Sequence, residues 1–172
     1  FMVSVMAVNH ETGTVQDVPV LCRLARAAGA LLHTDAVQAA GKIRIDAAGW
    51  DVDMMTLCAH KIYGPQGVGA LYVRPSPPVP IAPVMGGEVL RAGTVPLALA
   101  AGFGAACRLT ASDHPVGAQK VHNVFLSVWQ AAGIKFAVNA ASAHRRVPHI
   151  INVRFEGVDA ADMMLDLSAR VT

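Results

Sequence analysis

Charge is scarce in this sequence: only 15% of its 172 residues are charged, and the net charge is +2. Its basic and acidic residues are few and scattered, so they do not form the basic surface that nucleic-acid binding requires. The pair Arg145–Arg146 is typical of a solvated loop. Hydrophobic residues make up 53% of the chain, which is enough for a large core and argues against intrinsic disorder.

Long apolar runs and paired cysteines are also missing. No stretch approaches the roughly 20 apolar residues of a membrane-spanning helix. Residues 1–8 lack the basic leader and cleavage pattern of a secretory signal, and their composition favours a buried strand. Cys22, Cys58 and Cys107 have neither disulfide-like nor metal-ligand spacing. We therefore expect free thiols, no metal site and a cytoplasmic protein.

The apolar segments alternate between strand-like and helix-like patterns. We expect strands over residues 1–8, 30–34, 52–59, 69–74, 134–138 and 150–155, and helices over 18–28, 95–111, 116–133 and from Asp159 onward. The order of strand, helix, strand, loop and strand predicts an α/β sheet that is at least partly parallel. Neither end of the chain resembles a natural terminus, so we expect a fragment of a longer protein.

Two charged side chains, Asp35 and Lys61, follow the ends of apolar strands. In open α/β sheets, ligands bind in the crevice beyond the carboxyl ends of the strands. A carboxylate and an amine there suit pyridoxal phosphate, which bonds to a lysine and needs an acidic partner for its protonated ring nitrogen. A structural ion pair at the sheet edge is the alternative, and spacing alone favours that alternative.

Several strings of residues change this weighting. Residues 8–17 read VNHETGTVQD, residues 33–38 read HTDAVQ, and residues 59–74 read AHKIYGPQGVGALYVR. In this order they resemble the NifS-like cysteine desulfurases of the class-V aminotransferase group. Residues 91–96, RAGTVP, and residues 148–155, PHIINVRF, resemble later motifs of the same family.

The resemblance implies a fold and a division of the chain. Residues 1–111 would form part of the large domain of a type I pyridoxal-phosphate-dependent transferase, a mostly parallel sheet with flanking helices. Residues 112–172 would begin a smaller α+β C-terminal domain. Enzymes of this family usually work as homodimers.

The resemblance also implies an activity for the parent protein. The family converts L-cysteine to L-alanine and passes the sulfur to a cysteine of the enzyme, then to an acceptor or scaffold protein, for example in iron–sulfur cluster assembly. The loop with that cysteine and the arginine that binds the substrate would lie outside this chain, so we expect the fragment alone to be inactive. Two alternatives stay open: a selenocysteine lyase or another class-V lyase or aminotransferase, and a non-catalytic relative that keeps the fold for dimerisation or partner binding.

Five positions match the cofactor-binding residues of the family. By this resemblance Lys61 bonds covalently to pyridoxal phosphate and moves protons at the substrate α-carbon. Asp35 is the partner of the ring nitrogen, and Gln38 is a donor to the phenolic oxygen. His60 is a phosphate ligand, and Thr94 reaches the phosphate of the neighbouring subunit.

Three features depart from the family pattern. His10 replaces the second asparagine of Asn-Asn-Glu, an amide that contacts the cofactor, and an imidazole there brings a charge that depends on pH. Cys58 replaces a serine whose hydroxyl binds the phosphate, and a thiol is a weaker donor. The loop over residues 86–91 is shorter than its counterpart in the family.

Three further side chains have competing interpretations. We expect Cys22 and Cys107 to be core residues of apolar helices. His33 is equally compatible with a place beside the cofactor ring and with a packed core histidine.

Overall fold

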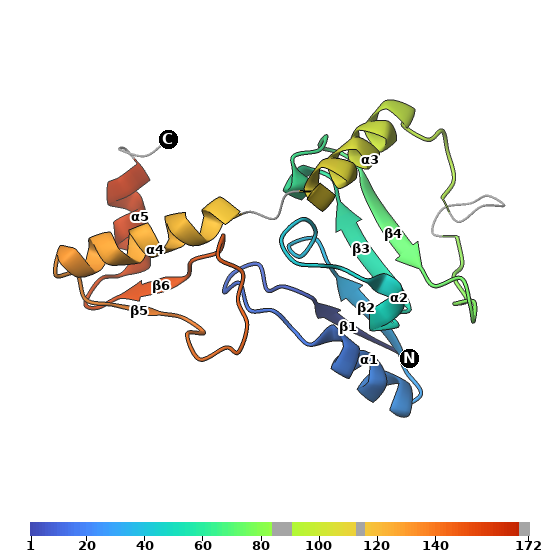
Figure 1. The fold of residues 1–172 in the computed structure, drawn as a ribbon, viewed down its shortest axis with the longest axis horizontal. Helices are drawn as coiled ribbons and strands as arrows, with labels where there is room; N and C mark the ends of the chain where they lie inside the picture. Colours follow the sequence, from blue (N-terminus) through green and yellow to red (C-terminus); the bar gives the residue numbers. More distant parts are fainter. Residues whose placement is uncertain (84–90, 113–115, 169–172) are drawn as a thin grey trace.

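The computed structural model describes residues 1–83, 91–112 and 116–168 (Figure 1). The elements are β1 (Met2–Met6), α1 (Val18–Ala27), β2 (Leu31–Asp35), α2 (Ala47–Trp50), β3 (Met54–Cys58), the 3-10 turn η1 (His60–Ile62), β4 (Gly69–Val73), α3 (Leu97–Ser112), α4 (Val116–Ala131), β5 (Phe136–Val138), β6 (Val153–Phe155) and α5 (Ala160–Ser168). The first four strands form one sheet in the order β1-β2-β3-β4, and β5 and β6 form a second. The first three strands are parallel and β4 is antiparallel, which confirms the expected α/β class.

Helix α1 covers one face of the four-stranded sheet, and its sequence explains how it forms. The Asp17 side chain caps the helix by accepting a hydrogen bond from the backbone nitrogen of Val20, 3.1 Å away. Val18, Cys22 and Ala25 recur at helical spacing and are all buried in the core beneath the sheet. This packing fixes the sheet from one side.

The opposite face of the sheet carries the polar side chains of interest. Along β2, Leu32 and Thr34 are buried on the covered side, so alternation places His33 and Asp35 on the other side. In the parallel register Asp35 lies opposite Thr56 of β3, whose side chain therefore shares that face. Within the described residues, no helix covers this face of the sheet.

A buried ion cluster holds the strands together at the edge remote from these residues. Asp53, at the start of β3, is only 3% exposed. One of its carboxylate oxygens accepts a hydrogen bond from the backbone nitrogen of Leu32, 2.7 Å away, and the other is paired with the guanidinium of Arg74. Paired and hydrogen-bonded, this carboxylate can be buried without a net charge in the core.

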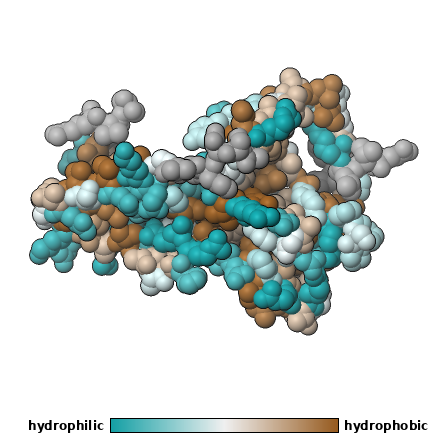
Figure 2. Space-filling model, viewed as in Figure 1, coloured by the Kyte–Doolittle hydropathy of each residue, from teal (hydrophilic) through white to brown (hydrophobic). Residues whose placement is uncertain are grey.

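The C-terminal elements form a separate layer of helix on sheet. Trp129 of α4 packs edge-on against Phe136 and Phe155, with ring centroids 5.5 and 5.3 Å apart. The outer side of α4 exposes Val121, Val124, Phe125 and Val128. Figure 2 shows hydrophobic side chains over this end of the molecule. The described helices include none with the length and hydropathy needed to cross a membrane.

Candidate active site

Three loops begin side by side where β1, β2 and β3 end. The backbone nitrogen of Ala7 donates to the carbonyl of Asp35, 2.8 Å, and the nitrogen of Ala36 donates to the carbonyl of Thr56, 3.0 Å. These hydrogen bonds extend the parallel pairing just past the strands. The loops that carry His10, Gln38 and Lys61 therefore leave the same edge of the sheet, as the sequence predicted for Asp35 and Lys61.

Asp35 is half-buried at this edge, and its own loop orients it. Its Oδ1 accepts a hydrogen bond from the backbone nitrogen of Val37, 2.9 Å away. Gln38 follows in the same turn and is also half-buried. A carboxylate held this way is a preoriented acceptor at the strand end.

The next loop exposes His60 and Lys61 because the residues around them are anchored. Ala59 is fully buried and Ile62 is 3% exposed, and both pack in a cluster with α3. The backbone nitrogens of Ile62 and Gly64 donate to the carbonyl of Ala59 at 3.0 and 2.9 Å, which closes the 3-10 turn. The buried residues hold the turn rigidly against the helix, and the imidazole and the amine face outward.

Glycine is required at position 64 by close approach. A Cβ on Gly64 would lie 3.0 Å from both the Cβ and the carbonyl oxygen of Ala59, and 3.1 Å from the Cβ of Ala106 on α3. The residue before it, Tyr63, has a positive φ of 62°. The lack of a side chain at position 64 thus allows the turn after the lysine to pack against α3.

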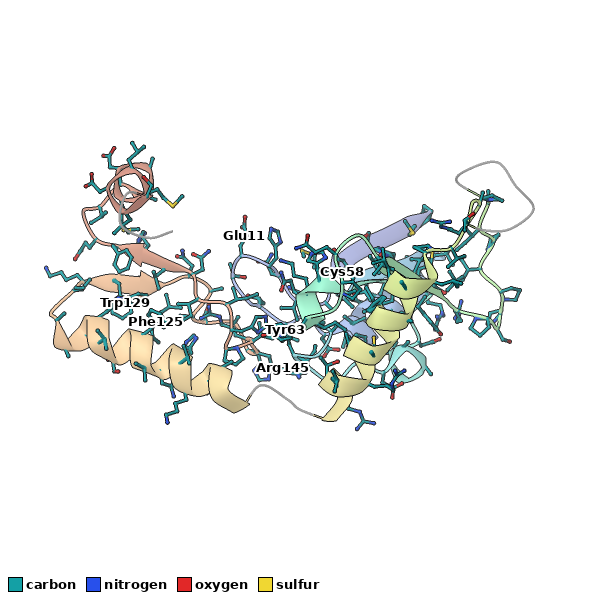
Figure 3. All side chains as sticks on the ribbon, turned by 90° about the horizontal axis from the view of Figure 1, so that it is seen from above. Glu11, Cys58, Tyr63, Phe125, Trp129 and Arg145 are labelled. Atoms are coloured by element: carbon teal, nitrogen blue, oxygen red, sulfur yellow. The ribbon has the colours of Figure 1, made fainter. Side chains whose placement is uncertain are left out.

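Cys58 and His60 form a contact beside Lys61. The Cys58 Sγ lies 3.9 Å from Nε2 of His60, and Cys58 is half-buried on the sheet face that carries Asp35. Figure 3 shows Cys58 next to the 3-10 turn that follows β3, with Tyr63 nearby. The thiol is therefore next to an imidazole in the loop that carries the lysine.

His10 is exposed in a turn that Asn9 organises. The Asn9 Oδ1 accepts hydrogen bonds from the backbone nitrogens of Glu11 and Thr12 at 2.9 and 2.8 Å, and from the Thr12 hydroxyl at 3.1 Å. Such an Asx turn sets the direction of the chain through position 10. The turn follows the end of β1, so His10 belongs to the same edge as the other two loops.

Arg146 forms hydrogen bonds to this turn. The prediction that Arg145–Arg146 is a solvated loop is therefore wrong for Arg146. Its Nε and Nη2 both donate to the carbonyl of Thr12, at 3.1 and 2.9 Å. The backbone nitrogen of Val147 also donates to the carbonyl of Gly13, 2.9 Å, and Val147 is only 2% exposed. The sequence alone does not reveal the distant partner of Arg146, so the basic pair was expected to be solvated. The apolar Val147 that follows was the only local sign that this segment packs against the protein.

His33 is held by hydrogen bonds on both ring nitrogens. Its Nδ1 lies 2.7 Å from the Ser4 hydroxyl, and its Nε2 lies 2.8 Å from the Thr56 hydroxyl. It shares a sheet face with Asp35, so it is neither in the apolar core nor free. Ser4 and Thr56 were missed because only the strand register brings them beside the histidine.

The remaining predicted residues lie elsewhere or differ from expectation. Thr94 is exposed before α3, and within the described ranges its hydrogen bonds join it to Arg91, 2.9 Å, and to none of the three loops. Most of the loop over residues 86–91 lies outside the described residues. Cys22 is buried as expected, but Cys107 is exposed. The Ala- and Leu-rich sequence of α3 has no polar side that could mark which face is covered.

The donor set at the three strand ends fits pyridoxal phosphate. A carboxylate suits a protonated ring nitrogen, a primary amine suits the aldehyde carbon, and imidazole, thiol and backbone groups suit a phosphate. A cavity of about 950 Å³ lies elsewhere, lined by residues of β5 and β6 and of the loops that flank them. Among the described residues, no three His, Cys, Asp or Glu side chains are grouped to hold a metal ion.

Comparison with known proteins places the chain in a family. Residues 1–171 match the aminotransferase class-V family. The cysteine desulfurase IscS of Photorhabdus laumondii is 38% identical over 96% of this chain and 42% of its own length. DndA from Streptomyces lividans superposes with a TM-score of 0.80 at 37% identity, covering 98% of this chain and 49% of the other. A NifS-like protein from Rickettsia africae gives a TM-score of 0.86 at 25% identity, with 98% and 48% covered. The chain thus spans less than half the length of these relatives, and it belongs to the class-V aminotransferase family.

Proposed function

We propose that this chain is the cofactor-binding part of a cysteine desulfurase that depends on pyridoxal phosphate. The whole protein would convert L-cysteine to L-alanine and pass the sulfur to one of its own cysteines, then to an acceptor protein. One observation carries the proposal: Asp35 and the Cys58–Lys61 loop leave the same edge of adjacent parallel strands. The relatives that bear the name cysteine desulfurase support it.

The residues at the strand ends have distinct roles in this proposal. When bound, the cofactor draws electrons from the substrate α-carbon. Asp35 accepts a hydrogen bond from the ring nitrogen, and Val37 keeps its carboxylate in place. Lys61 holds the cofactor and moves the proton at the α-carbon. Gln38 donates to the phenolic oxygen.

The phosphate end of the cofactor falls to the remaining residues. We propose that His60 and Cys58 contact the phosphate, and that His10 contacts the cofactor from the turn after β1. An imidazole and a thiol in place of the family's amide and hydroxyl would make cofactor affinity more dependent on pH and on the state of the thiol.

The lysine assignment has a direct test. The full-length protein is incubated with L-cysteine, alanine and sulfide are measured, and the absorbance of the bound cofactor is recorded. Lys61→Ala should abolish both the products and the absorbance of the lysine-bound cofactor. Lys120→Ala, an exposed lysine on α4, is the matched control and should match the wild type. Unchanged absorbance in Lys61→Ala would overturn the assignment.

The products also separate the two alternatives. Faster release of alanine from L-selenocysteine than from L-cysteine would favour a selenocysteine lyase. Bound cofactor without alanine from either substrate would favour a non-catalytic relative, which the departures at His10 and Cys58 would explain.

The proposal extends to a cytoplasmic homodimer with a large domain over residues 1–111 and a small domain that begins at residue 112. Thr94 would contact the phosphate in the partner subunit, which fits its exposure before α3. Mixed dimers of Lys61→Ala and Thr94→Ala subunits test this. If Thr94 acts across the interface, one site of each mixed dimer is intact and about half the activity returns. No recovery would mean that Thr94 acts within its own subunit, and full activity of the Thr94→Ala homodimer would mean that Thr94 has no role.

A further inference from the structure

The contact between Cys58 and His60 has chemistry that the proposed reaction does not use. The two side chains flank Ala59, which is fully buried, and the Cys58 Sγ lies 3.9 Å from the His60 Nε2. Cys58 is half-buried and His60 is exposed, so solvent reaches the pair. A serine at position 58, as in the family pattern, would offer a hydroxyl of very low nucleophilicity there.

A thiol beside an imidazole is a pair that activates sulfur. The thiolate is the reactive form of cysteine, and a neighbouring histidine can take the thiol proton. Reactive cysteines are partly exposed and have such a partner, whereas buried structural cysteines are inert. Cys58 meets both conditions, because it is partly exposed and has His60 as a neighbour.

We propose that Cys58 and His60 form an oxidisable thiol site whose modification by a peroxide blocks the phosphate position of the cofactor. This inference rests on the proposed function, because it places the phosphate beside Cys58. Bound cofactor would shield the thiol, and an oxidised thiol would exclude the cofactor. Cofactor loading would then depend on redox conditions.

The oxidation step is balanced without any further reactant. The sulfur of Cys58 attacks one oxygen of a peroxide ROOH, the O–O bond breaks, and a sulfenic acid and ROH form. Sulfur loses two electrons and the peroxide gains them. The thiol proton passes through His60 to the leaving oxygen. A second peroxide gives a sulfinate, whose negative charge lies where the phosphate would bind.

The chain contains its own reference thiols. Cys22 is 3% exposed, and burial raises the pKa of its thiol although the nearby charge of Arg26 acts in the opposite direction. Cys107 is exposed on α3, where it lines a cavity with Gly41 and Ile62, and it is not among the residues that we propose to contact the cofactor. Cys22 should therefore stay unreactive, and Cys107 should react to the same extent with and without cofactor.

The first measurement is of labelling. Full-length protein, with and without pyridoxal phosphate, is treated with limiting hydrogen peroxide, sulfenic acid is trapped with dimedone, and each cysteine peptide is quantified by mass spectrometry. With cofactor at about 100 times its Kd, labelling of Cys58 should fall by about a hundredfold if only the free protein reacts. His60→Gln should slow the labelling of Cys58 but not of Cys107. Equal labelling of Cys58 with and without bound cofactor would refute the inference.

The second measurement is of cofactor binding. Wild type, Cys58→Ser and Cys107→Ser are titrated with pyridoxal phosphate before and after peroxide, each compared with itself. Wild type and Cys107→Ser should bind at least about tenfold more weakly after treatment, the scale of one lost hydrogen bond to a charged group. Cys58→Ser should be unaffected. Equal losses in Cys58→Ser would refute the inference, whereas no binding by untreated wild type would refute the proposed function instead.

Discussion

Replacing Arg146 with alanine tests whether a segment distant in sequence holds the His10 turn. Arg146 donates twice to the carbonyl of Thr12, from Nε at 3.1 Å and from Nη2 at 2.9 Å. Both bonds share one acceptor, so we count them as a single charged hydrogen bond of about 1.5–3 kcal/mol. Removing the side chain should lower the free energy of local opening by about that amount.

The turn should loosen but not disappear. The backbone of Val147 still donates to Gly13, and the backbone of Val15 still donates to Arg145, both at 2.9 Å. The three hydrogen bonds to the side chain of Asn9 are also unaffected. We therefore expect a local effect, with amide exchange over residues 9–15 faster by about 10-fold to 150-fold.

Hydrogen–deuterium exchange with peptide resolution checks this, alongside titration of the full-length protein with pyridoxal phosphate. Arg145→Ala is the matched control, because the Arg145 side chain is next to Arg146 in the sequence but is exposed. Arg146→Lys should be intermediate, since an ammonium can donate to the carbonyl but without the planar fork. We call the two hydrogen bonds from Arg146 to the carbonyl of Thr12 the clamp. Equal amide exchange over residues 9–15 in Arg146→Ala and Arg145→Ala would mean that the clamp does not stabilise the turn, and would refute this prediction.

Three other perturbations follow from buried or constrained groups. Asp53→Ala should cost about 3–5 kcal/mol of unfolding free energy in urea denaturation, because it removes a buried carboxylate that pairs with Arg74 and accepts from the backbone nitrogen of Leu32, whereas the exposed Asp51→Ala should cost less than about 1 kcal/mol; similar losses would contradict the burial argument. Burial, and then the charge of Lys42, lowers the pKa of His149 below its ordinary 6.5, so the unfolded chain takes up the proton first and stability should fall as pH drops below about 6.5. His149→Phe should flatten that dependence between pH 7 and 5, and an unchanged slope would exclude this histidine as its cause. Gly13→Ala should cost at least about 1–2 kcal/mol, because φ is 74° and the new Cβ would lie 3.2 Å from a carbonyl of the docked segment; a neutral effect on thermal unfolding would mean that the turn adapts.

Local signals in the sequence were enough to predict most of the fold. Asp17 and the helical spacing after it set α1, and the apolar runs gave each strand of the first sheet to within a few residues. The short helix α2 was not predicted, because its four residues include a glycine and show no periodicity. The antiparallel direction of β4 follows from a connection too short for a crossover helix.

The site was predictable where its residues follow strands directly, and not where tertiary contacts decide. Asp35 and the Cys58–Lys61 loop could be placed because parallel strands end at one edge. The hydrogen bonds of His33 depend on the register with β1 and β3, which no single segment encodes. The exposure of Cys107 likewise depends on which face of α3 the core covers.

The clamp on the His10 turn links cofactor binding to the docking of residues 145–147. Suppose that the cofactor binds only when the turn is closed. Closure of the turn then strengthens cofactor binding, and the bound cofactor stabilises the closed turn by the same coupling free energy. The loss of affinity in Arg146→Ala therefore cannot exceed the energy of the clamp, about 1.5–3 kcal/mol. A larger loss would mean that Arg146 contacts the cofactor itself, and a loss of zero with a loosened turn would mean that His10 does not. The comparison of exchange rates with binding constants thus tests whether the turn that contains His10 contributes to cofactor binding.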